Sequence, residues 1–254
     1  SCVTFKVTGE AAMDLDGVKR EAFSLFWQGT LSTMIEGCNS FVPRVGPDLE
    51  KSDYYGLGLI INHGYVLTGI FPITFNKAFM VSALLGTNVL SESELIQCFL
   101  EYVSDFDSLQ LNIAFQVGSS EETFTSDTQA FLLEFLSKFQ IRQLPKPSNI
   151  KSIISRIAKT ELILKPGVAL ECVKKGLHAG LYTELWDGCQ KENIFHVYHV
   201  YQKLGVSPTA VVSLLQVNEN GLTKSQFQVV SFLKRYIRSL NKENLQLFMR
   251  YVTG

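Results

Sequence analysis

Apolar residues recur at helical spacing along most of this chain, and this periodicity limits the fold more than any other feature. In the segment 14–33, for example, Val18, Ala22 and Leu25 lie four and three residues apart, as on one face of an α-helix. Strict alternation, which is typical of a half-buried strand, is clear only in residues 3–7. The pattern therefore predicts a mainly α fold, with an α+β character limited to minor short strands.

Capping residues and apolar runs place the expected helices. Ser91 and Glu94 form a capping-box pattern, in which each side chain hydrogen-bonds the backbone amide of the other residue at the start of a helix. Thr223 and Gln226 repeat this pattern near the end of the chain. Residues 37–51, with two prolines and two glycines, are predicted to form a loop. The predicted helices span about 54–67, 76–85, 95–103, 127–139, 149–164, 168–178, 207–215, 223–240 and 241 to the end.

Composition limits the classes of partner. The 254 residues carry 23 Lys and Arg against 24 Asp and Glu, so the formal net charge of −1 does not favour nucleic acid or an anionic membrane. The most apolar run, 55–71, is interrupted by Asn62-His63-Gly64. Its uninterrupted parts are too short to cross a bilayer. We therefore expect no nucleic-acid partner and no membrane partner.

The cysteines and histidines give no metal or cofactor pattern. The five cysteines are widely scattered and form no CxxC pair, which favours a reducing cytoplasmic or nuclear compartment over a disulfide framework. His196 and His199 could share a helical face as two zinc ligands, but a structural zinc needs about four and no Cys or acid pair completes the set. Gly56-Leu57-Gly58 lacks the third glycine of a dinucleotide-binding loop. We expect no metal and no cofactor.

Three motifs, spaced along the chain, carry the main functional indication. They are residues 5–23, with Gly9-Glu10, Asp14 and Arg20-Glu21; residues 54–61, followed by Phe71-Pro72 and Leu84-Leu85-Gly86; and residues 232–254, which end in Arg250-Tyr251-Val252-Thr253-Gly254. In order and spacing they resemble the catalytic domain of HECT-type ubiquitin ligases, whose divergent branch with zinc-finger segments is the most similar. The chain departs from that family at Asp16, where the family usually has the first glycine of a pair.

This resemblance implies a two-lobed organisation. Residues 1–217 would form the HECT amino-terminal lobe, and residues 222–254 the first helices of the carboxy-terminal lobe. The polar segment 218–221, with Asn220 and Gly221, is the predicted hinge between them.

The resemblance also implies a reaction and partners. In the family, the large lobe holds a ubiquitin-conjugating enzyme, and a cysteine thiolate accepts ubiquitin before passing it to a lysine of a protein substrate. That cysteine follows the Val-Thr-Gly segment, so we expect it downstream of Gly254. None of the five cysteines in this chain has the family's Thr-Cys context, and we assign the catalytic role to none of them.

Cys189 is the alternative nucleophile that the residues themselves suggest. It lies beside a predicted turn in Trp186-Asp187-Gly188-Cys189. However, a neighbouring carboxylate raises the pKa of a thiol and lowers its thiolate fraction. The residues therefore favour an ordinary thiol.

The region that the family uses to dock the conjugating enzyme, near residues 105–147, is the least similar. Here residues 119–147 predict an acidic loop, a helix around 131–136 and a proline-rich exit. Phe131, Phe135 and Phe139 are spaced by four residues and form a stripe along that helix. The stripe is either a partner-binding face or part of the core.

The last two helices are basic, because they contain Lys234, Arg235, Arg238, Lys242 and Arg250. Such a basic surface could attract ubiquitin, an acidic partner or nucleic acid. The apolar residues at positions 227, 230, 233 and 237 of the same helix favour instead an ordinary amphipathic helix with a solvated basic face.

Two functions therefore remain open. The chain is part of a HECT-type ubiquitin ligase without its nucleophile, or it is a non-catalytic, HECT-derived scaffold for protein interaction.

Overall fold

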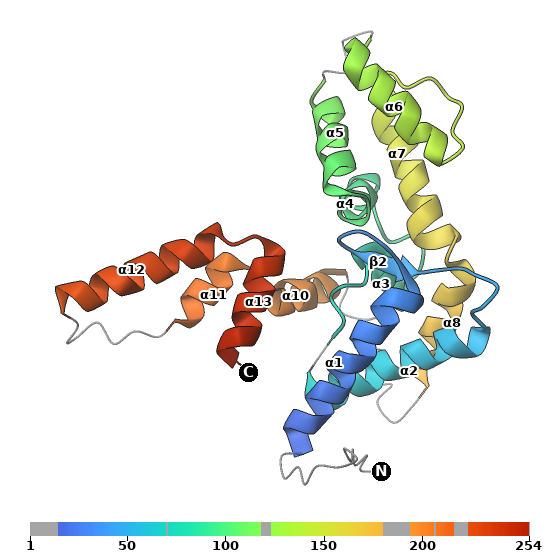
Figure 1. Cartoon of the computed structure of the whole chain (residues 1–254). Helices are drawn as coiled ribbons and strands as arrows, with labels where there is room; N and C mark the ends of the chain where they lie inside the picture. The colour runs from blue at the N-terminus through green and yellow to red at the C-terminus, as the bar shows by residue number, and fades with distance from the viewer. Residues whose placement is uncertain are drawn as a thin grey trace. The chain divides into compact units, whose positions relative to one another are not determined.

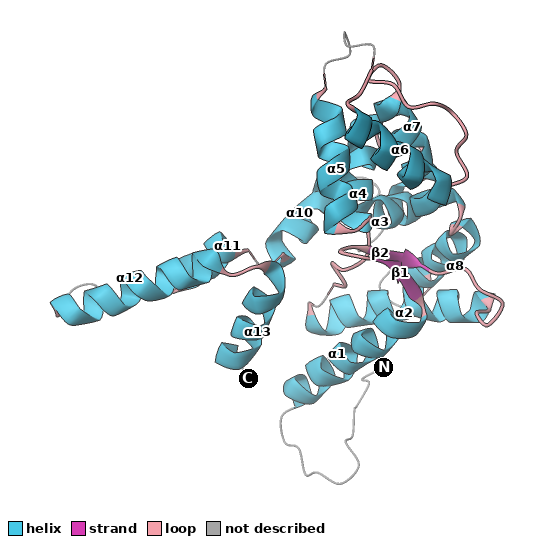
Figure 2. Cartoon of the chain, turned by 45° about the horizontal axis from the view of Figure 1, so that its top comes forward, coloured by secondary structure: helices cyan, strands magenta, loops and turns pink. Residues whose placement is uncertain are grey.

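The computed structural model describes residues 15–69, 71–117, 123–179, 194–205, 207–215 and 223–253. These residues are mainly helical, with one two-stranded sheet, which confirms the predicted fold class (Figures 1 and 2). The contacts divide the chain into two compact units, Ser1–His199 and Val200–Gly254. The boundary predicted at 218–221 therefore lies inside the second unit.

The first unit contains most of the elements. They are α1 (Leu15–Thr33), β1 (Ile35–Gly37), β2 (Phe41–Pro43), α2 (Lys51–Thr68), α3 (Lys77–Leu85), α4 (Glu92–Tyr102), α5 (Asp105–Gln116), α6 (Ser126–Lys138), α7 (Ile150–Lys159), a π-helical turn η1 (Thr160–Leu164) and α8 (Gly167–His178). Helix α10 (Ile194–Leu204) spans the boundary between the units. The second unit continues with α11 (Pro208–Leu214), α12 (Lys224–Ser239) and α13 (Lys242–Thr253).

Helices of the first unit form two groups. Helix α2 packs against α1 and α8, and α3 packs against α8, whereas α4, α5, α6 and α7 pack mainly on one another (Figure 1). The α3–α4 and α3–η1 contacts join the groups. The helices of each group thus pack mainly on one another, and both groups belong to one unit.

The first group depends on two glycines that bring α2 and α8 together. A Cβ atom on Gly58 would collide with the carbonyl oxygen of Val173 and would lie 2.9 Å from the Cα atom of Gly176. A Cβ atom on Gly176 would lie 2.8 Å from the amide nitrogen of Leu59. The helix backbones are therefore in direct contact, and no larger residue fits at either position without a shift.

Buried Asn76 links the sheet to both helix groups. Its side-chain nitrogen donates to the hydroxyl of Ser40 at 2.7 Å and to the carbonyl oxygen of Cys98 at 2.8 Å. Its side-chain oxygen accepts from the amide of Ala78 at 2.9 Å and so caps α3. Because Asn76 is fully buried, loss of this side chain would leave polar groups without partners in the core.

Local signals predicted the helix starts well. The capping boxes of Ser91 with Glu94 and of Thr223 with Gln226 are both present. In each, the amide of the first residue donates to the side chain of the second at 2.9 Å, and the amide of the second donates back at 3.3 Å. The predicted helix 149–164 is also present, although its last five residues form the π-helical turn η1. The predicted strand 3–7 lies outside the described residues.

The β1–β2 hairpin corrects the predicted loop at 37–51. Its turn donates two backbone hydrogen bonds to the end of α4, from Cys38 to the carbonyl of Tyr102 and from Ser40 to that of Glu101, each 2.9 Å long. The last carbonyls of a helix have no partner within the helix. The hairpin is therefore held by hydrogen bonds to a distant helix. Strands of three residues are too short to show an alternating pattern in the sequence, so the hairpin was not predicted.

The second unit has a small core of its own. Val211 of α11, Ile237 of α12 and Leu245 of α13 are buried together. Val212, Leu215, Leu233, Leu240, Phe248 and Met249 pack around them. Across both units, none of the described helices is long and apolar enough to span a bilayer.

We predict that Gly58→Ala and Gly176→Ala each lower the free energy of unfolding by about 1–3 kcal/mol, because the added methyl group forces α2 and α8 apart. The matched control is Gly56→Ala on the same helix, where an added Cβ meets nothing within 4 Å. This control is expected to stabilise the helix by up to about 1 kcal/mol. Urea unfolding followed by far-ultraviolet circular dichroism measures all three variants, and equal effects at positions 56 and 58 would contradict the backbone contact.

Candidate protein-docking surface

Helix α5 lies at the start of the region that the HECT resemblance assigns to docking. The hydroxyl of Ser104 caps it by accepting a hydrogen bond from the amide of Asp107 at 3.1 Å. The side-chain nitrogen of Asn39 donates to the carboxylate of Asp105 at 2.7 Å and ties the helix start to the β1–β2 turn. The first turn of α5 is therefore held by a helix cap and by a hydrogen bond from the β1–β2 turn.

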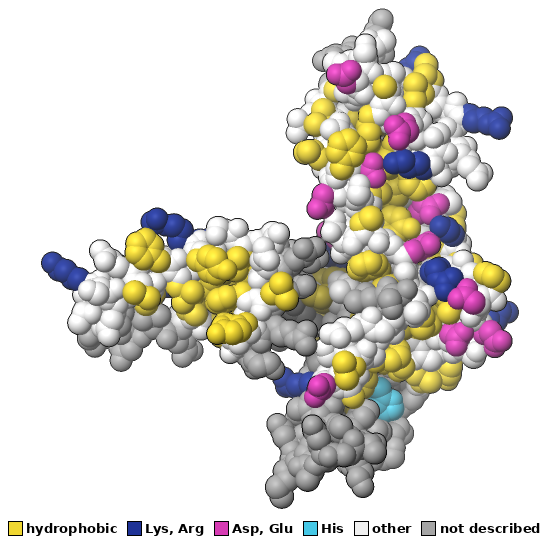
Figure 3. Space-filling view, viewed as in Figure 1, with side chains coloured by type: hydrophobic (Ala, Val, Ile, Leu, Met, Phe, Trp, Pro, Cys, Tyr) yellow, Lys and Arg dark blue, Asp and Glu magenta, His cyan; other side chains and the backbone are white. Residues whose placement is uncertain are grey.

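Helix α5 has apolar side chains on two faces. Leu111 and Ala114 are fully buried and point into the unit. Phe106, Leu109 and Ile113 lie on another face and are 64%, 59% and 42% exposed. We call these three residues the α5 face, and Figure 3 shows hydrophobic side chains at the surface over this helix.

A series of aromatic contacts connects the α5 face to the core. The ring of Phe106 meets that of Phe131 edge to face at 5.9 Å, and Phe131 stacks on Phe135 at 5.6 Å. Phe135 in turn contacts Phe99 of α4 at 6.3 Å. Such contacts hold rings in defined positions, so Phe106 is anchored although most of its surface is exposed.

The predicted Phe131, Phe135 and Phe139 stripe needs a correction at its centre. Phe135 is only 1% exposed, because it packs against Phe99, and Phe139 is half-buried with its ring 5.7 Å from Phe99. Phe131 is half-buried beside Phe106. Phe135 is therefore not accessible to a partner, and the exposed apolar surface lies on α5. The partner-binding role of Phe131 and Phe139 stays a prediction.

Acidic groups border this surface at the N-terminal end of α5. The helix contains Asp105 and Asp107 and no Lys or Arg. The Lys138 ammonium lies 3.7 Å from the carboxylate of Asp107 and 5.7 Å from the ring centre of Phe135. This contact joins α6 to α5, while Asp105 stays exposed. The surface can thus offer apolar contacts with an acidic edge.

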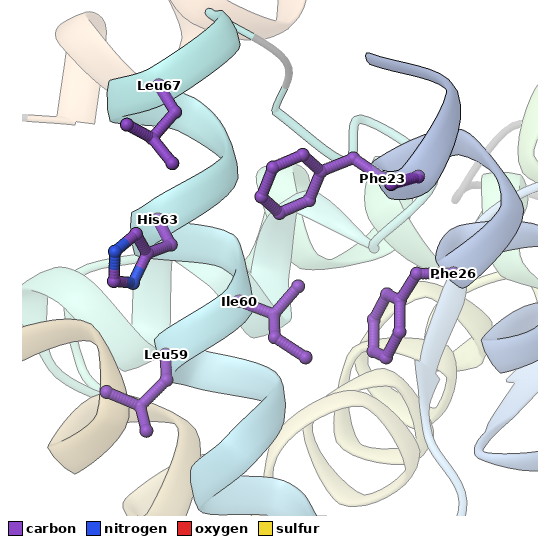
Figure 4. Close-up of a pocket in the computed structure, with 7 residues that line it drawn as sticks. Phe23, Phe26, Leu59, Ile60, His63 and Leu67 are labelled. Atoms are coloured by element: carbon purple, nitrogen blue, oxygen red, sulfur yellow. The ribbon is translucent and has the colours of Figure 1, made fainter. Parts of the chain in front are cut away.

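An apolar pocket of about 410 Å³ lies between α1 and α2. Figure 4 shows Leu59, His63 and Leu67 following one another along α2, with Phe23 and Phe26 coming from α1. Ala22 and Ile60 complete the lining. His63 is the single titratable residue of the seven, so this lining supplies no paired acid and base, and we assign no reaction to it.

The other predicted site residues are not brought together by the described structure. Asn220 and Gly221 of the predicted hinge, and Cys189, lie outside the described residues. His199 is exposed on α10, and the side chain of His196 is not described. In the described parts of the chain, no three His, Cys, Asp or Glu side chains gather as metal ligands.

Among the described cysteines, Cys38 is exposed, Cys172 is half-buried and Cys98 is buried. Burial, reinforced by the charge of Glu101, raises the pKa of the Cys98 thiol to about 12. Since the thiolate is the nucleophile, Cys98 is unsuited to accept ubiquitin.

Helix α5 and its exposed face were not predicted from the sequence, although two signals were present. Ser104 and Asp107 have the spacing of a helix cap, and Phe106, Leu109 and Ile113 have helical spacing. The spacing alone does not show that a second apolar set, Leu111 and Ala114, takes the buried side.

We predict that Cys98 reacts with iodoacetamide at pH 8 at least about a hundredfold more slowly than Cys38, because burial and a raised pKa both suppress its thiolate. Peptide mapping by mass spectrometry separates the two sites. In urea the two rates should converge, and equal rates in the folded chain would contradict the burial of Cys98.

No protein-family model matches this chain, and no curated protein and no solved structure matches it.

Proposed function

We propose that this chain is part of a HECT-type ubiquitin-protein ligase, in which it is the scaffold that docks a ubiquitin-conjugating enzyme through the α5 face. The proposal rests on two lines, of which the second uses the docking region that the first implies. The order and spacing of the three sequence motifs resemble that family, and the chain exposes apolar side chains within residues 105–147, where the family docks its partner.

The observation that carries the docking role is the exposure of Phe106, Leu109 and Ile113 on a helix whose other side is already buried. An isolated exposed apolar side chain needs no explanation, but a contiguous group is typical of an interaction surface. Full burial of a large apolar side chain contributes about 1.5–3 kcal/mol. Three partly exposed ones can therefore supply several kcal/mol to a transient complex of roughly 1,200 Å².

In this proposal the chain contributes geometry and a separate cysteine contributes the chemistry. The ligase thiolate attacks the thioester carbonyl of ubiquitin on the conjugating enzyme, and the thiolate of that enzyme leaves. The amine of a substrate lysine then attacks the new thioester and loses a proton, so that an amide forms and the ligase thiolate is released. The buried Cys98 fits neither step.

A second candidate is a non-catalytic, HECT-derived scaffold whose α5 face binds another protein. The departure of residues 105–147 from the family favours it. In this region the aromatic rings of α6 pack largely against α4 and α5. The two candidates differ in one observable, which is whether a conjugating enzyme binds the α5 face.

We predict that Phe106→Asp or Leu109→Asp weakens binding of a ubiquitin-conjugating enzyme by at least about tenfold, because each change places a charge where an apolar contact is buried. Isothermal titration calorimetry of the whole chain against a panel of conjugating enzymes measures this effect. Both residues are exposed, so circular dichroism should show an unchanged fold.

The matched control is Val168→Asp, which changes an equally exposed residue on α8 and should leave the affinity unchanged. If no conjugating enzyme binds at about 1 mM chain, which corresponds to about −4 kcal/mol, the ligase proposal fails and the non-catalytic scaffold takes its place. If one binds but tolerates both α5 variants, the α5 face is not the docking surface.

A further inference from the structure

Helix α12 of the second unit also has two apolar faces. On one face, Ile237 is buried in the small core and Leu233 packs against it. On the other, Val229, Phe232 and Tyr236 are 65%, 62% and 55% exposed. From the sequence, only the face with Leu233 and Ile237 was predicted to be apolar. The opposite side of the helix was predicted to be basic and solvated.

Val229, Phe232 and Tyr236, here called the α12 strip, are spaced by three and four residues. They therefore lie on one side of the helix over about 10 Å of its length. This is the anchor spacing by which one helix packs along another in groove-type recognition.

Both aromatic rings of the α12 strip are held in place within the second unit. The ring of Tyr236 meets that of Phe248 on α13 edge to face at 6.3 Å. The guanidinium of Arg235 lies over the ring of Phe232 at 5.9 Å. A surface that is ordered before binding loses less conformational entropy when a partner arrives.

The charge around the strip is positive. Helix α12 contains Lys224, Lys234, Arg235 and Arg238 and no acidic residue. Residues 200–254 as a whole carry seven Lys and Arg against two Asp and Glu. Since the whole chain has a net charge of −1, the acidic excess lies elsewhere in the sequence. Figure 3 shows hydrophobic and basic side chains together at the surface over α12.

We propose that the α12 strip binds an acidic amphipathic segment of another protein. Apolar side chains of that segment pack on Val229, Phe232 and Tyr236, and its carboxylates pair with Arg235 and the neighbouring basic groups. This proposal concerns a different unit from the α5 face and does not depend on the ligase assignment.

Two other anionic partners fit the strip less well. Nucleic-acid bases stack on open aromatic faces, but the guanidinium of Arg235 already lies over the ring of Phe232. A helix that lies in a membrane buries a broad apolar face, whereas the inner side of α12 already packs in the core of the second unit. A protein segment needs only the narrow strip and its basic border.

A displayed library of random peptides of about 16 residues, roughly four helical turns, tests the proposal when it is selected on the whole chain. The selected peptides are expected to be rich in Asp and Glu, with apolar residues three and four apart. Their affinities, measured by fluorescence anisotropy, should fall about tenfold for Phe232→Ala. They should fall further for Arg235→Glu, and also when the salt concentration rises from about 0.05 M to about 0.5 M.

The matched controls are Leu214→Ala, an equally exposed residue of the same unit, and Arg142→Glu in the first unit. Both should bind the selected peptides as the unchanged chain does. Peptides that are not acidic, or that bind the Phe232→Ala variant equally well, overturn the proposal.

Further assays use vesicles that contain phosphatidylserine, a single-stranded oligonucleotide, and sedimentation of the chain alone. Binding to vesicles or oligonucleotide, or self-association, that Phe232→Ala abolishes while no acidic peptide binds would assign the strip to a different occupant. Failure at the α12 strip leaves the Phe106 and Leu109 variants to test the α5 face separately.

Discussion

The backbone contact between α2 and α8 at Gly58 and Gly176 is the constraint on which much of the first unit depends. Helix α2 also contacts three other residues, which are Phe23, Leu177 and Arg44. It packs against Phe23 of α1 at Gly64, where a Cβ atom would lie 3.1 Å from the ring. It also donates from Asn62 to the carbonyl of Leu177 at 3.0 Å, and from the hydroxyl of Tyr54 to the carbonyl of Arg44 at 2.8 Å. A wider separation of α2 and α8 would disturb all of these neighbours.

In the second helix group (α4, α5, α6 and α7), packed aromatic rings hold Phe106 of the α5 face in position although it is exposed. Phe99, Phe135 and Phe131 connect the core of α4 and α6 to Phe106 at the surface. Exposed apolar side chains favour aggregation unless a partner covers them. The α5 face and the α12 strip share this property, and they differ in charge, because α5 carries only acidic charged residues and α12 only basic ones. The two proposals therefore call for partners of opposite charge.

The sequence predicted features that depend on neighbouring residues and missed those that depend on distant ones. The capping boxes at Ser91 and Thr223 are local, and both were predicted correctly. The β1–β2 hairpin was missed because its turn bonds to the end of α4, far along the chain. The spacing of Phe131, Phe135 and Phe139 predicted that they share one face of a helix. It could not predict that Phe99 packs against that face and buries Phe135. The contacts divide the chain after His199, whereas the hinge expected before Gly221 lies outside the described residues and stays a prediction.

Hydrogen exchange of the whole chain, with and without a saturating ubiquitin-conjugating enzyme, tests whether the α5 face is the docking surface. We expect slower exchange in α5 (Asp105–Gln116), with no change in the amides of α2 and α8, which already pack against each other. Slower exchange confined to other elements, with α5 unchanged in a demonstrably formed complex, would contradict the claim that the α5 face is the docking surface.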